Sequence, residues 1–148
     1  MLKEFIRNKM KINFYEPIHG DYLQYVVMIC HYQGKWVFCQ HQKRQTLELP
    51  GDHREEGEDN LTAAKRELYE ETGAIQYHIK PLCEYSVIDD DQKESFGMLY
   101  DVEILELESQ LHYEIAKVVL MDELPKHWTY PDIQPYLIQH YQMMKENG

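Results

Sequence analysis

The stretch LELPGDHREEGEDNLTAAKRELYEETGA, residues 47–74, changes from a strand pattern to a loop and then to a helix. Residues 46–49 predict a short strand, which Pro50 and Gly51 end because these residue types interrupt strands and favour turns. Residues 52–59 then form a polar loop with five acidic side chains. We therefore expect a strand, a charged loop and a helix in direct succession.

The helix is predicted from residue 60 to residue 72. Asp59 or Asn60 is the expected N-cap, since the short polar side chains of these residues accept hydrogen bonds from the first free backbone N–H groups. Gly73 is the expected stop, because glycine adopts the left-handed conformation that ends many helices. Apolar residues at helical spacing form one stripe: Leu61, Ala64 and Leu68.

Three carboxylates of this helix share one face, opposite the apolar stripe. Glu67, Glu70 and Glu71 stand at positions i, i+3 and i+4, a spacing that brings side chains together. Like charges at this spacing cost about 0.2–0.5 kcal/mol per pair, and a bound divalent cation would turn the repulsion into attraction. The alternative is a solvated acidic face on which Arg66 pairs with Glu70.

The segment as a whole resembles the Nudix box, G-x5-E-x7-R-E-U-x-E-E-x-G-U, in which U is apolar. Eight of the nine fixed positions match: Glu58, Arg66, Glu67, Leu68, Glu70, Glu71, Gly73 and Ala74. The resemblance implies a Nudix-type α/β/α sandwich with a mixed, curved β-sheet between helices. It also implies one domain over residues 1–148, with the box at 51–74, and a metal-dependent hydrolase of phosphorus anhydrides.

One position departs from the box, because Asp52 stands where the opening glycine is expected. Gly51 still matches the first glycine of the pair that usually follows Leu-Pro. Aspartate tolerates the left-handed region better than most residues, so the replacement is either tolerated or adds a carboxylate to an altered metal site.

The resemblance also implies roles for individual residues. Glu67 would be the catalytic glutamate, binding metal or acting as base on water, and Arg66 would orient it by a charge-assisted hydrogen bond. The implied metal is Mg²⁺ or Mn²⁺, since Mg²⁺ takes one or two carboxylates together with water and phosphate oxygens. The implied metal ligands are the Gly51 carbonyl oxygen, Glu58, Glu67, Glu70, Glu71 and Glu114.

Glu114 comes from a second similar segment. Residues 114–125, EIAKVVLMDELP, resemble the part of the family in which a loop glutamate precedes a strand and an Asp-Glu-Leu-Pro turn. Glu114 is therefore a further candidate for catalysis and metal binding. The alternatives are a surface glutamate at this position, or the use of Glu94, Asp101 or Glu103 in its place.

The chain before the box carries the hairpin residues Gly34-Lys35-Trp36, followed by His41, Lys43 and Arg44. This arrangement is similar to the nucleoside triphosphate branch of the family, which includes MutT-type hydrolases of 8-oxoguanine nucleotides. Lys43 and Arg44 are the expected phosphate-binding residues, with a solvated basic turn as the alternative. His41 and His53 are the histidines placed to meet a substrate. We expect hydrolysis of a nucleoside triphosphate, including an oxidised purine form, to the monophosphate and pyrophosphate.

Other functions stay open at this point. The box specifies cleavage of a diphosphate linkage, so ADP-ribose and dinucleoside polyphosphates are alternative substrates. A Nudix fold that binds nucleotides without turnover is an alternative of a different class, and a third is an interaction domain whose acidic residues bind no metal.

The rest of the chain predicts strands with one further helix. Strand patterns occupy 24–32, 35–40, 74–79, 82–88, 96–105 and 117–121, the first two as a hairpin. Pro131 suits the first turn of a helix at the C-terminal end. Its mostly apolar face would comprise Ile133, Tyr136, Leu137, His140 and Met144. Two helices can cover the two faces of a mixed sheet.

The composition of the chain limits the partners that it can bind and indicates the cellular compartment in which it acts. The 148 residues carry a formal net charge of −11, which would repel duplex nucleic acid and anionic membranes. Three cysteines without C-x-x-C spacing predict reduced core residues. No apolar run is long enough for a signal peptide or a membrane span, so we expect a cytoplasmic protein that acts on small nucleotides. The oligomeric state is not readable from the sequence.

Overall fold

The computed structural model describes residues 10–17, 19–109 and 115–147. Within these ranges one sheet of seven strands has the order β1-β5-β6-β2-β3-β7, and β4 pairs separately with β2. Strands β2 and β6 run parallel, and the other paired strands run antiparallel. The strands are β1 (Lys11–Tyr15), β2 (Tyr25–Tyr32), β3 (Lys35–His41), β4 (Gly51–His53), β5 (Ala74–Ile88), β6 (Glu94–Leu107) and β7 (Ile115–Met121).

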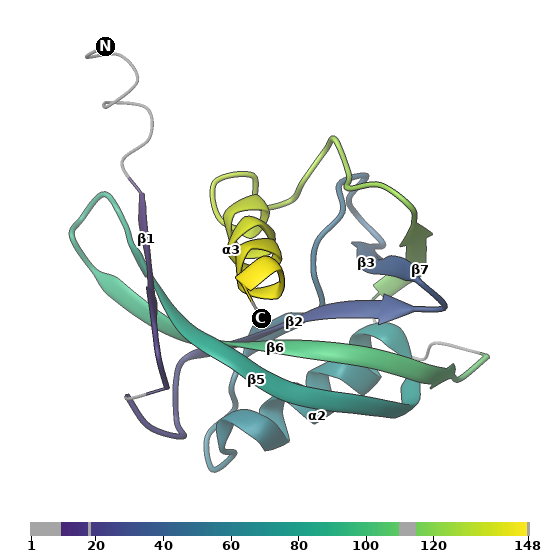
Figure 1. Cartoon of the computed structure of the whole chain (residues 1–148), viewed down its shortest axis with the longest axis horizontal. Helices are drawn as coiled ribbons and strands as arrows, with labels where there is room; N and C mark the ends of the chain where they lie inside the picture. The colour runs from purple at the N-terminus through teal and green to yellow at the C-terminus, as the bar shows by residue number, and fades with distance from the viewer. Residues whose placement is uncertain (1–9, 18, 110–114, 148) are drawn as a thin grey trace.

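Two helices lie on opposite sides of this sheet, as Figure 1 shows: α2 (Asn60–Thr72) below it and α3 (Gln134–Asn147) above it. Side chains alternate along β2, so Val26 and Met28 belong to the core on the α2 side while Val27 and Ile29 belong to the core on the α3 side. The predicted α/β/α sandwich with a mixed sheet is therefore confirmed, as is the β2–β3 hairpin.

Helix α2 has the predicted bounds and caps. The Asp59 carboxylate accepts a hydrogen bond from the Thr62 N–H at 2.8 Å, and Gly73 ends the helix with a φ of 76°. The predicted apolar stripe is wrong at one residue, because Leu61 is 43% exposed. Ala63 is buried in its place beside Ala64, since the small side chains let the helix lie close to the sheet.

The strand predicted at 46–49 is wrong in position. Leu47 and Glu48 make only isolated bridges, and the regular strand is β4, which begins at Gly51, where the sequence favoured a loop. Gly51 has a φ of 142°, and a Cβ atom there would lie 2.2 Å from the Val26 carbonyl oxygen. The missing side chain therefore lets β4 pair closely with β2, a contact that strand propensity does not report.

The two strands predicted at 74–79 and 82–88 are one strand, β5. The pairing with β6 shifts register between Pro81 and Cys83. Proline has no N–H to donate, and a bulge is one of the few places where a sheet accommodates it. The proline therefore marks an irregularity within a strand and not its end.

The C-terminal helix begins at Gln134, after a turn at 131–133, and its buried face differs from the predicted one. Leu137, Ile138 and Tyr141 are buried, whereas Tyr136 is 45% exposed. The three cysteines are reduced and buried, as predicted. Among the described residues, neither helix combines the length and apolar character needed to cross a membrane.

Candidate active site

The acidic face of α2 packs next to β4, and two of its three glutamates are buried. Glu67 is 7% exposed and Glu71 is 5% exposed, while Glu70 is half-buried. The Gly51 N–H donates a 2.6 Å hydrogen bond to Glu71 Oε1, so the start of β4 and the last turn of the helix are joined directly. These carboxylates therefore do not form a solvated face.

Arg66 connects three acidic residues of the box. Its Nη1 donates to Glu67 Oε1 at 2.7 Å and to Glu70 Oε2 at 3.1 Å. Its Nε and Nη2 donate to the two oxygens of Glu58 at 2.7 and 3.0 Å. Through these bonds Glu58 raises the pKa of Arg66, and Arg66 lowers the pKa of Glu58. Glu58 thus holds the guanidinium in place while the guanidinium holds Glu67.

Burial and mutual repulsion disfavour the charged forms of the inner carboxylates. Burial raises the pKa of Glu71 to about 9, and the nearby charges of Glu67, Glu48 and Asp52 act in the same direction. Burial also raises the pKa of Glu67, although Arg66 opposes the shift. Buried carboxylates without a matching number of cations suit a divalent metal ion, so this set of oxygen donors fits the divalent ion that the resemblance implies.

Asp52, the departure from the box, lies on β4 with an exposed side chain. Its carboxylate accepts from the His53 N–H and pairs with the His53 ring at 2.8 Å. The left-handed region is used at Gly51 and not at Asp52, so aspartate meets no backbone strain. The negative charge of Asp52 still helps to raise the pKa of Glu67 and of Glu71. Asp52 is therefore a further carboxylate near the candidate metal ligands.

A cavity of about 450 Å³ is lined by Gly51 and Asp52 of β4, the strand next to the α2 carboxylates. It is lined among others by Tyr25, His41, Arg44, Glu48, Asp52 and Tyr130. Arg44, one of the two expected phosphate-binding residues, donates to Glu48 Oε1 at 3.3 Å, and a hydrogen bond with Tyr130 raises its pKa. Lys43 is exposed on the turn after β3 and does not line the cavity.

The candidate Glu114 lies outside the described residues. Two of the alternatives have other partners: Glu94 accepts a hydrogen bond from Ser86, and Asp101 pairs with Lys145 at 2.7 Å. Val102 and Ile104 pack on the α2 side, so alternation along β6 turns Asp101 and Glu103 toward the α3 side. None of these three side chains joins the α2 carboxylates.

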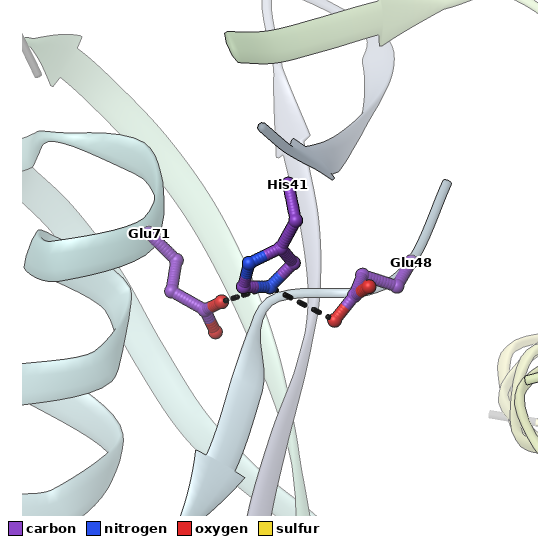
Figure 2. Close-up of side chains that lie close together, drawn as sticks. All are labelled: His41, Glu48 and Glu71. Atoms are coloured by element: carbon purple, nitrogen blue, oxygen red, sulfur yellow. Dashed lines mark ion pairs between the residues drawn. The ribbon is translucent and has the colours of Figure 1, made fainter. Parts of the chain in front are cut away.

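Sequence reasoning missed one group at the site. His41, Glu48 and Glu71 bring three potential ligand atoms within 4.8 Å of one another, and Figure 2 shows them converging from separate segments. No motif in the sequence pointed to Glu48. Its position depends on the bridge between Cys39 and Glu48, and a short irregular pairing of this kind has no sequence pattern.

Comparisons with known proteins agree with this geometry. The family model for the NUDIX domain matches residues 23–141. YtkD of Bacillus subtilis (strain 168), provisionally named an 8-oxo-dGTP diphosphatase, is 34% identical over 125 residues, which cover 84% of this chain and 78% of YtkD.

Solved structures give the same result. A mutant of the Bacillus subtilis pyrophosphohydrolase BsRppH superposes with a TM-score of 0.78 and 29% identity, over 94% of this chain and 91% of that one. A UDP-X diphosphatase shares the fold at a TM-score of 0.69 and 18% identity, over 99% of this chain and 71% of that one. The chain belongs to the Nudix family of hydrolases.

Proposed function

We propose that this Nudix hydrolase cleaves nucleoside triphosphates to the monophosphate and pyrophosphate, with 8-oxoguanine nucleotides among its substrates. The observation that carries the proposal is the buried carboxylate pair of α2, in which Arg66 orients Glu67 and the Gly51 N–H holds Glu71, next to a cavity lined by Gly51 and Arg44. The name of YtkD supports the substrate class. The single domain over residues 1–148 and the cytoplasmic location belong to the same proposal.

Glu67, Glu70, Glu71 and the Gly51 carbonyl oxygen would hold the divalent ion, Mg²⁺ or Mn²⁺. The bound ion would neutralise the charge that develops on the phosphate oxygens. These ligands come from two elements, β4 and α2, and the hydrogen bond from the Gly51 N–H to Glu71 holds the two elements together. Glu58 would act as a positioning residue, since both of its oxygens bind Arg66.

Glu67 is the proposed catalytic residue. A carboxylate whose pKa is raised by burial is a stronger base than an exposed one, so it can accept a proton from an attacking water more readily. The 2.7 Å hydrogen bond from Arg66 fixes one oxygen of Glu67. The other oxygen remains to face the water or the metal, and the orientation is set before the substrate binds.

The cavity is large enough for a nucleotide. Its volume of about 450 Å³ lies within the range of roughly 300–1,000 Å³ common for small-molecule sites. Arg44 offers a guanidinium to phosphate oxygens, which suits the planar and bidentate recognition that arginine provides. Lys43 lies outside the cavity, so in this arrangement it is part of a solvated basic turn.

The test is release of pyrophosphate and orthophosphate from 8-oxo-dGTP, dGTP and ADP-ribose, with Mg²⁺ or Mn²⁺. Pyrophosphate from a triphosphate is the expected product, and Glu67→Gln should lower kcat about 10²–10⁴-fold because the general base is lost. Glu106→Gln removes an exposed glutamate of β6 and should leave turnover unchanged.

The other outcomes reassign the function. A preference for ADP-ribose would keep the site and change the substrate class. Metal-dependent binding without turnover on any of the compounds would contradict hydrolysis and favour a nucleotide-binding module.

A further inference from the structure

His41, Glu48 and Glu71 converge on one point from three separate segments, as Figure 2 shows. His41 is the last residue of β3, Glu71 lies in the last turn of α2, and Glu48 lies in the segment before β4. The His41 Nε2 atom is 3.4 Å from Glu48 Oε2 and 3.6 Å from Glu71 Oε2. One ring nitrogen therefore faces two carboxylate oxygens at once.

Both contacts are ion pairs rather than hydrogen bonds. Both distances exceed the roughly 2.7–2.9 Å of a charge-assisted N–H···O bond. The other oxygen of each carboxylate is already used, Glu71 Oε1 by the Gly51 N–H and Glu48 Oε1 by Arg44. Among the ion pairs of the described residues, each Oε2 atom instead pairs with His41 alone, and both carboxylate side chains are at least nine-tenths buried.

The two distances from His41 Nε2 match the separations of ligands around a metal ion. A tetrahedral ion about 2.1 Å from each ligand has ligands about 3.4 Å apart. All three donor atoms lie within 4.8 Å of one another. His41 and Glu48 line the cavity described above, so an ion has a path to them from solvent.

The donor set also indicates which ions would bind. Two carboxylates offset the charge of a dication, and an imidazole nitrogen favours Mn²⁺, Co²⁺ or Zn²⁺ over Mg²⁺, which prefers six oxygen ligands. We propose that His41 Nε2, Glu48 Oε2 and Glu71 Oε2 bind a divalent transition-metal ion, in addition to the ion held by the box. The two sites share Glu71, but this one does not depend on the identity of the substrate.

The test uses the full chain, freed of metal by chelation and titrated with Mn²⁺ up to two ions per chain. Pulsed electron paramagnetic resonance detects a ¹⁴N nucleus bonded to Mn²⁺, and carboxylate ligands give no such coupling. We expect the ¹⁴N coupling in the wild-type protein, its persistence in excess Mg²⁺, and its loss in His41→Gln. His53→Gln is the matched control, because His53 lines the same cavity but is 69% exposed and outside the group.

The proposal is overturned if the wild-type protein at two Mn²⁺ per chain shows no ¹⁴N coupling, a result that needs no variant to fold. It is equally overturned if the coupling persists in His41→Gln or disappears in His53→Gln. Circular dichroism checks that each variant is folded. The coupling is independent of turnover, so a protein that binds Mn²⁺ through nitrogen but hydrolyses no nucleotide would support this site and contradict the proposed function.

Discussion

At the scale of single residues, Gly51 sets the geometry of the site. Its missing side chain permits the close approach of β4 to β2, and its N–H fixes Glu71. The departure of Asp52 from the box is harmless to the backbone for this reason, because the demanding conformation falls one residue earlier. The glycine requirement of the box is therefore met at residue 51.

Gly51→Ala should lower the free energy of unfolding by about 3 kcal/mol or more, since the new Cβ meets backbone atoms that cannot yield. The matched control is Gly57→Ala, where φ is 87° but nothing lies within 4 Å of the added atom. That variant should lose only about 1–2 kcal/mol, the cost of a left-handed alanine. Urea unfolding measures the free energy of unfolding of both variants. Equal losses of stability would show that backbone strain, and not the clash with Val26, explains the need for glycine at residue 51.

At the scale of elements, α2 is fixed at both ends independently of its acidic face. Asp59 caps the first turn and Gly73 the last, while Glu67 and Glu71 lie in the second half of the helix. Asn60 adds an anchor, because its side-chain oxygen accepts from the Leu23 N–H at 2.8 Å. Stability of the helix start and chemistry of the helix end can therefore be separated by mutation.

Asp59→Ala should cost about 1 kcal/mol of stability, the usual effect of removing an N-cap, while kcat changes little. Asp59→Asn keeps an oxygen that can accept from the Thr62 N–H and should stay within a few tenths of a kcal/mol of wild type. Chemical denaturation gives the stability and the pyrophosphate assay gives kcat. A large fall in kcat for Asp59→Ala in the folded protein would contradict the separation.

The sequence predicted α2 better than the strands around it, for physical reasons. Helix bounds follow from caps and short-range spacing, and both were present at Asp59 and Gly73. The start of β4 depends on a close contact between Gly51 and Val26, and the continuity of β5 depends on a bulge at Pro81. Such long-range contacts leave no local pattern in the sequence.

The same distinction holds for the candidate site. The box predicted the neighbourhood of Arg66 and the α2 glutamates because those residues are close in sequence. His41 and Glu48 join Glu71 only through the pairing of separate segments, so no motif includes them. The buried state of Glu67 was likewise unreadable, since it depends on what packs over the helix.

At the scale of the whole molecule, His31 reports on the contact between the sheet and α3. Its ring lies 4.5 Å from that of Trp36 and 5.9 Å from that of Tyr141. Burial lowers its pKa, against the opposing charges of Asp101 and Glu103, with Lys145 adding to the decrease. The folded protein therefore holds this imidazole neutral at a pH where the unfolded chain protonates it.

Acid should weaken the fold through this group. The unfolded chain protonates His31 at a pKa of about 6.5, whereas the folded protein does so only at a lower pH. The free energy of unfolding therefore falls as the pH drops from about 6.5 toward the lower pKa of the folded state. The His31→Gln variant should lose less stability than wild type between pH 7 and pH 5 in denaturant titrations. His78→Gln, at an exposed position of β5, should keep the wild-type slope, and identical slopes for all three proteins would contradict the role of His31.

The parallel pairing of β2 with β6 also has a consequence for the order in which the chain folds. The hairpin of β5 and β6 joins neighbours in sequence, but β2 meets β6 only after the chain between them, with β4 and α2, has closed into a loop. Loop closure must precede the contacts that reward it, so this step is slow compared with hairpin formation. The α2 carboxylates and their partners on β3 and β4 are therefore not brought together by any hairpin of neighbouring strands. We expect them to meet only when β2 pairs with β6 and completes the sheet.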